Sequence, residues 1–125
     1  MTHELALLAA LFKPHMQCTW TEPGKAPVRF RSDNMATPSG SLLYQRNYGT
    51  GFDEIIVYAY DTAHKRYVRS QLSSDGAEAS AQSAGPVNGI WRLTGLHAKG
   101  AISWKRTGDV SRYWYDGVRG MGVCR

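Results

Sequence analysis

The sequence lacks the features that mark several common classes of protein. No stretch of its 125 residues approaches the roughly 20 apolar residues of a membrane-spanning helix, so no membrane span is predicted. It contains no Gly-x-Ser-x-Gly motif, no phosphate-binding loop and no paired-carboxylate pattern, so no enzyme class is indicated. Its fifteen lysines and arginines outnumber its ten acidic residues but form no basic stripe, so nucleic-acid binding is not expected.

Patterns that bind metals or cofactors are also missing. The two cysteines, Cys18 and Cys124, have no second ligand at the spacing of a zinc site. The sequence has four histidines: His3, His15, His64 and His97. They form no His-x-x-x-His pattern and are interpreted as surface residues. We therefore predict no metal and no cofactor, since haem ligation by His15 or His97 has only analogy with other barrels in its favour.

The chain is instead rich in glycine and in amphipathic aromatic residues. It has thirteen glycines, seven tyrosines and four tryptophans, but only three phenylalanines. This composition is typical of β proteins with many turns. With 42% hydrophobic and 20% charged residues, the chain is expected to fold as one domain over residues 1–125.

A short helix is predicted over residues 2–13. Thr2 can cap its first turn, and apolar residues from Leu5 to Phe12 recur at helical spacing before Pro14 ends the pattern. Residues 4–12 resemble a signal peptide in composition but lack its flanking basic region and cleavage site, so we assign them to the mature domain. So short a helix must dock to be stable, and we expect it at the mouth or floor of a barrel.

Beyond Pro14 the hydrophobic period changes to two, the period of β-strands. Turn signals such as Pro23-Gly24 and Asp75-Gly76 separate the segments. Strands are predicted over 16–22, 27–32, 40–48, 53–60, 66–72, 77–83, 88–94, 99–106, 110–116 and 120–125. Strands that recur about every 8–12 residues indicate an all-β fold, either a sandwich or an up-and-down antiparallel barrel. We predict a barrel of about 8–10 strands over residues 16–125.

The two cysteines lie near opposite ends of this strand series. A sheet that closes on itself brings its first and last strands together, so this spacing favours a closed barrel. Two interpretations remain open for the pair. Cys18 and Cys124 either form a disulfide across the seam, at the short Cα distance that adjacent strands provide, or stay free and buried in a cytosolic protein.

Several short motifs succeed one another in a characteristic order. They are Cys18-Thr19-Trp20, Tyr58-Ala59-Tyr60-Asp61 followed by Lys65-Arg66-Tyr67, Ser73-Ser74-Asp75-Gly76, Gly89-Ile90-Trp91 and Cys124-Arg125. In this order they resemble a family of secreted bacterial lipocalin-like barrels that has no assigned activity. The resemblance covers most of the chain and implies a calycin-type meander barrel in a periplasmic or secreted setting. It implies no reaction, because one fold hosts many functions.

Aromatic residues on different predicted strands are candidates for the wall of a ligand cavity. They are Trp20, Tyr44, Tyr58, Trp91 and Trp104. Such side chains either line a cavity or simply fill the core of a small barrel. Arg112 shares a predicted face with Val110 and Trp114. If that face is inward, the guanidinium needs a ligand carboxylate or an internal partner such as Asp61 or Glu54, and otherwise it points outward.

These observations leave three functions open. The leading expectation is binding of a small, partly apolar ligand inside the barrel. The first alternative is a filled barrel with a structural or protein-interaction role, whose short last strand offers an edge for pairing into a homodimer. The second is a cofactor-free cyclase or isomerase, which requires a buried tyrosine or carboxylate facing an open cavity. Cavity volume separates the first two, because ligand pockets usually exceed about 300 Å³.

Overall fold

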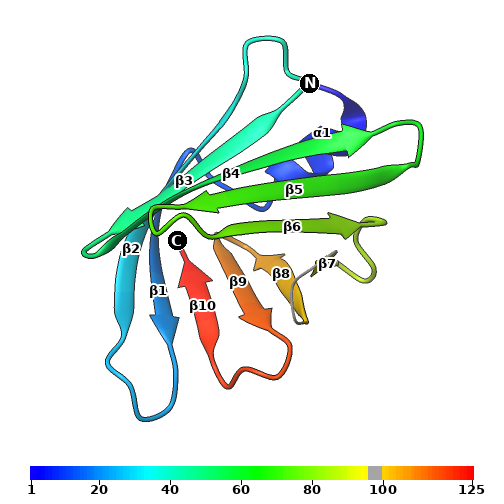
Figure 1. Cartoon of the computed structure of the whole chain (residues 1–125). Helices are drawn as coiled ribbons and strands as arrows, with labels where there is room; N and C mark the ends of the chain where they lie inside the picture. Colours follow the sequence, from blue (N-terminus) through cyan, green and yellow to red (C-terminus); the bar gives the residue numbers. More distant parts are fainter. Residues whose placement is uncertain (96–99) are drawn as a thin grey trace.

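The computed structural model describes residues 1–95 and 100–125 and shows a closed antiparallel β-barrel with one short helix (Figure 1). Within these residues the strands are β1 (His15–Thr21), β2 (Val28–Ala36), β3 (Leu43–Gly49), β4 (Phe52–Asp61), β5 (Arg66–Ser73), β6 (Glu78–Ser83), β7 (Ile90–Gly95), β8 (Ala101–Thr107), β9 (Val110–Tyr115) and β10 (Met121–Cys124). Each strand pairs with the next in sequence, and β10 returns to pair with β1. The predicted up-and-down barrel is therefore confirmed. His97 and the start of the strand expected over 99–106 lie outside the described residues.

The helix α1 spans His3–Ala9 and is shorter than the predicted 2–13. The Thr2 side chain caps it as expected, by accepting a hydrogen bond from the Leu5 amide at 3.2 Å. Beyond Ala9 the chain tightens, because the Leu11 and Phe12 amides donate to carbonyls three residues earlier, each at 3.0 Å. These bonds are of 3₁₀ type, so the apolar stripe continues after the α-helix itself has ended.

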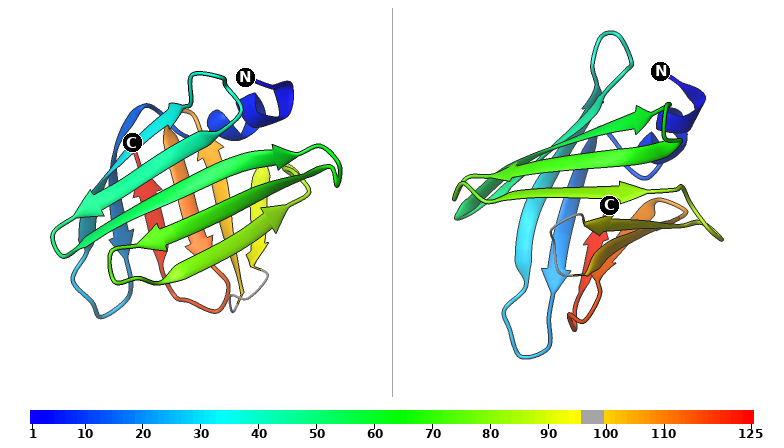
Figure 2. Two further views of the ribbon diagram at one scale, coloured as in Figure 1. Left: turned by 45° about the horizontal axis from the view of Figure 1, so that its top comes forward. Right: turned by 45° about the vertical axis from the view of Figure 1, so that its right-hand side comes forward.

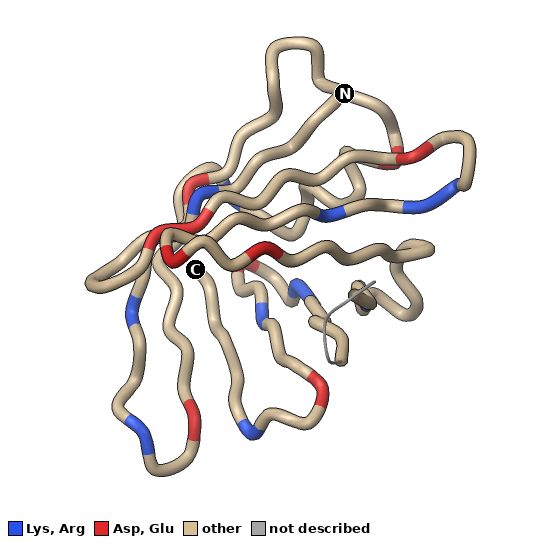
Figure 3. Tube along the Cα trace, in the orientation of Figure 1, with Lys and Arg blue, Asp and Glu red and all other residues tan. Residues whose placement is uncertain are grey.

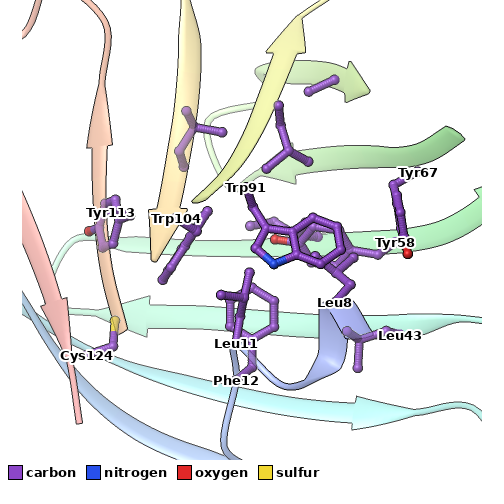
Figure 4. Close-up of a cluster of buried hydrophobic side chains, with 14 of the residues drawn as sticks. Leu8, Leu11, Phe12, Leu43, Tyr58, Tyr67, Trp91, Trp104, Tyr113 and Cys124 are labelled. Carbon is purple, nitrogen blue, oxygen red and sulfur yellow. The ribbon is translucent and has the colours of Figure 1, made fainter. Parts of the chain in front are cut away.

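The helical segment lies over one end of the barrel (Figure 2) and fills it with apolar side chains. Figure 4 shows Leu8, Leu11 and Phe12 reaching toward the aromatic side chains of the strands. The Phe12 ring lies 5.1 Å from the Trp104 ring and 5.7 Å from the Tyr58 ring, measured between centroids. The Tyr67 hydroxyl also donates to the Glu4 carbonyl at 2.8 Å, which ties α1 to β5. This end of the lumen is closed.

The seam between β1 and β10 is covalently joined. Gln17 and Arg125 exchange both backbone hydrogen bonds at 2.9 Å, so the next pair, Cys18 and Cys124, is of the non-hydrogen-bonded kind. Such pairs bring Cα atoms closest together in an antiparallel sheet, and here they are 4.1 Å apart. The predicted disulfide is present, and neither cysteine is free. Both edges of β10 are paired, so the prediction that this strand offers an edge for a homodimer is wrong.

The longest ladder of the described residues joins β4 and β5. It includes eight residue pairs, from Glu54 opposite Ser73 to Asp61 opposite Arg66. The described part of the ladder between β6 and β7 stops at Gly95, next to residues 96–99, and includes Ala81 opposite Gly95 and Gln82 opposite Thr94. No helix among the described residues is long and apolar enough to cross a membrane.

Candidate functional site

The alternation of each strand decides which of the predicted site residues enter the lumen. Trp20, Tyr58, Trp91 and Trp104 all lie on the inward faces of their strands. Tyr58 is only 1% exposed, and Trp91 and Trp104 are almost as deeply buried. Part of the expected aromatic lining is therefore inside the barrel, although Tyr58 and Trp91 pack against the helical end rather than around a void.

Tyr44 and Arg112 lie on the outer face instead, which corrects their expected place in the lumen. Leu43 and Gln45 flank Tyr44 on β3 and are both buried, so Tyr44 has the outward position between them. On β9 the buried residues are Ser111 and Tyr113, and Arg112 between them is exposed. Both strands carry apolar and polar residues on both faces, so composition alone does not indicate which face is turned inward.

Aromatic rings form one wall of the lumen near the β1–β10 seam. The Tyr113 ring lies between those of Trp104 and Trp20, with centroid distances of 4.6 and 5.4 Å. Gly122 on β10 makes this packing possible, because a Cβ atom at that position would overlap the Tyr113 ring. The Trp20 indole donates to the Glu22 carboxylate at 2.8 Å. Burial raises the pKa of Tyr113, so its hydroxyl stays protonated at neutral pH.

A network of buried amides connects β2, β3 and β4 inside the lumen. The Asn34 side chain donates to the Lys13 carbonyl at 2.9 Å and accepts from Gln45 Nε2 at 2.8 Å. Gln45 also donates to the Ser32 hydroxyl at 3.2 Å and accepts a long hydrogen bond from the Tyr58 hydroxyl at 3.4 Å. Burial raises the pKa of Tyr58, which keeps this hydroxyl a donor. Through the hydrogen bond to Lys13, the network joins the inner face of β2 to the segment between α1 and β1.

A carboxylate is held in the lumen at the end opposite α1. Glu54 on β4 accepts from Asn47 Nδ2 at 3.0 Å through one oxygen and from Gln71 Nε2 at 2.9 Å through the other. Gln71 also donates to the Ser73 hydroxyl at 3.1 Å. Two amide donors from neighbouring strands thus fix the position of this side chain. The sequence suggested Glu54 only as a partner for Arg112, which lies on the opposite side of the sheet.

The most unusual residue of the lumen is Arg69 on β5. Its side chain is inward and only 8% exposed, it forms no ion pair with any described residue, and it interacts with the Tyr58 hydroxyl on the neighbouring strand. Its Nε atom is completely buried without a partner. Two other buried atoms in the described part of the chain share this condition, Asn47 Oδ1 and Trp104 Nε1. Polar groups of this kind are rare in folded proteins, because burial without a hydrogen bond costs free energy.

The three residues that carry these buried atoms line one cavity. Its wall also includes Glu54, Tyr113 and the Cys18–Cys124 disulfide, and Tyr115 and Phe30 lie on the side away from α1. Tyr115 is 41% exposed, and the cavity is partly open to solvent. Its volume is about 30 Å³, room for very few water molecules and far below the roughly 300 Å³ of a typical ligand pocket. A cavity of this size counts against the expected binding of a whole ligand inside the barrel, and no drug-sized ligand fits inside this conformation.

Some of the charges on the outside of the barrel are paired. Figure 3 shows basic and acidic residues interspersed along the strands and turns. Arg46 binds Asp53 through two hydrogen bonds, of 2.8 and 3.1 Å, and Arg92 binds Asp116 in the same bidentate way. Arg69 differs from the exposed arginines that form no ion pair, such as Arg112, because it is buried in the lumen. No protein-family model and no curated protein matches this sequence, so the chemistry of the lumen is the basis for assigning a function.

Proposed function

We propose that this protein binds a small, partly apolar ligand at the end of the barrel opposite α1. One observation carries this proposal. The helical segment seals one end of the lumen with apolar side chains, whereas the other end has a partly open cavity with aromatic walls and unpartnered polar atoms. Apolar ligand surface would gain about 25 cal/mol per Å² on burial there. Polar side chains of the cavity wall, such as Arg69 and Glu54, would orient the ligand.

The cavity limits what part of the ligand is enclosed. A volume of about 30 Å³ accepts a head group of very few atoms. The rest of the ligand then lies at the mouth, against the side chains of Phe30 and Tyr115. The ligand is thus held by its head, with its apolar part only partly removed from water.

The two alternatives have weaker support. The small cavity favours a filled barrel with a structural role, but a core that is only structural gains nothing from an unpaired buried arginine. A cyclase or isomerase has in Tyr113 and Glu54 a tyrosine and a carboxylate in the cavity wall, but a volume of about 30 Å³ does not enclose a substrate. The pKa values of Tyr58 and Tyr113 are both raised, which makes their hydroxyls donors rather than bases at neutral pH.

The proposed setting is periplasmic or secreted. The Cys18–Cys124 disulfide supports it, because disulfides persist mainly in oxidising compartments. The resemblance to secreted bacterial lipocalin-like barrels supports the same setting and is the basis for placing this barrel among them.

A cavity-filling variant tests the binding function. Ile102 lines the cavity, whereas Ile55 is an isoleucine exposed on the outer face, so Ile102→Phe and Ile55→Phe form a matched pair. Protein purified gently from its source is weighed by native mass spectrometry, and circular dichroism verifies that each variant is folded. We expect a non-covalent mass on the wild type and on Ile55→Phe, and none on Ile102→Phe. A wild type that carries no added mass, or equal masses on both variants, would refute the proposal.

A further inference from the structure

We infer that the head group of this ligand is a carboxylate and that Arg69 binds it. The inference rests on the proposed function and specifies its chemistry. It starts from a cation that is buried in the lumen without an ion-pair partner among the described residues, and whose Nε atom has no hydrogen-bond partner. Burial of an unpaired charge is costly, and a fold retains one only where something compensates for it.

No carboxylate in the described part of the chain pairs directly with Arg69. Glu54 lines the same cavity, but its two oxygens accept from Asn47 and Gln71, and no ion pair joins it to Arg69. Residues opposite Arg69 on the neighbouring strands are Tyr58 and Ala81. The Tyr58 hydroxyl interacts with the guanidinium, but burial raises the pKa of Tyr58 more than Arg69 lowers it, so this partner is neutral at neutral pH. The place of a directly paired counter-ion is therefore open to a ligand.

The cavity favours a carboxylate over larger anions. A guanidinium presents paired N–H groups that match the two oxygens of a carboxylate. A dianion such as phosphate is disfavoured, because Glu54 places a negative charge in the wall and the volume is only about 30 Å³. A singly charged, flat head group fits both conditions.

The wall next to Arg69 indicates the chemistry of the group attached to the carboxylate. Phe30, Ile56 and Ile102 contribute apolar surface to the cavity. A straight hydrocarbon chain leaving the head group would contact them on its way to the mouth. The ligand class is thus a linear monocarboxylate, bound with its head group inward.

The test compares acids with alcohols of equal chain length. Acetate, butanoate and octanoate are titrated against ethanol, 1-butanol and 1-octanol, and binding is measured by isothermal calorimetry. The variant Arg69→Met keeps a long unbranched side chain but removes the charge. Arg112→Met is the matched control, because Arg112 is an exposed arginine on the outer face. We expect at least one acid to bind at least about 10-fold more tightly than its alcohol, and Arg69→Met alone to abolish that difference.

Thermal stability without added ligand provides a second measurement. If Arg69 only supported the fold, Arg69→Met would lower the melting temperature. We expect an equal or higher melting temperature, because the variant removes an uncompensated buried charge. Equal binding of acids and alcohols, full acid binding by Arg69→Met, or a lower melting temperature would refute the role of Arg69. The first two results leave the binding function intact, whereas absence of any bound mass on the source protein refutes that function itself.

Discussion

Removing the disulfide should destabilise the barrel strongly, although it removes only one bond. Cys18 and Cys124 are 106 residues apart, so the bond closes almost the whole chain into a loop. For a loop of this length the chain-entropy model gives a loss of about 5 kcal/mol in the free energy of unfolding. At a typical unfolding entropy per residue, this corresponds to a fall of about 18 °C in melting temperature for a chain of 125 residues.

The variant Cys18→Ala/Cys124→Ala measures this loss. Urea unfolding monitored by tryptophan fluorescence gives the free energy of unfolding of the wild type and of the variant. Wild type unfolded to equilibrium in a reducing agent is the control, because it lacks the bond but keeps both side chains. The two forms without the bond should agree. A loss below about 1 kcal/mol in both would refute the entropic reasoning, and a loss in the variant alone would point to packing of the buried sulfurs.

Three further perturbations concern packing, hydrogen bonding and charge. Gly122→Ala should lower the free energy of unfolding by about 1–3 kcal/mol or more, because the new methyl group overlaps the Tyr113 ring. An unchanged melting temperature would contradict this. Asn34→Ala should lower the free energy of unfolding, measured in urea, by about 1–3 kcal/mol, because Gln45 Nε2 loses one hydrogen-bond acceptor. A change within about 0.5 kcal/mol would show that water replaces the Asn34 amide. The hydrogen bond from Arg46 lowers the pKa of Asp53 below 3.8. Ionised Asp53 therefore stabilises the fold above about pH 3.8, and this contribution is lost as the pH falls through the lowered pKa. The melting temperature of Asp53→Asn should therefore lie below that of the wild type at about pH 7 and equal it at about pH 2, and a gap that persists in acid would contradict this.

The fold was predictable because its signals are local and repeated. The period-two pattern and the turn residues place every strand within a few residues of its observed position. The spacing of Cys18 and Cys124 predicts closure because only a closed sheet brings the first and last strands together. The end of the helix was misjudged because Leu11 and Phe12 continue the apolar spacing through 3₁₀ turns, which the pattern does not distinguish from α-helix.

The polar part of the lumen was not predictable in the same way. On β5, Val68 and Leu72 share one face, and Arg69 and Gln71 the other. Hydrophobicity favours an inward Leu72, yet Leu72 is 55% exposed and Arg69 is inside. Alternation divides a strand into two faces, but the ladder with β4, which sets Arg69 opposite the buried Tyr58, decides which face is inward. The barrel does contain an inward arginine, but it is Arg69 and not Arg112.

The disulfide also fixes where the barrel cannot come apart. It joins the first strand to the last, so β1 and β10 cannot separate while the bond between Cys18 and Cys124 is intact. Local opening occurs at the weakest set of cooperative contacts, so it has to begin at another ladder. The amide hydrogens of Gln17 and Arg125, which bond across this seam, should accordingly exchange with solvent more slowly in the oxidised protein than in the reduced one.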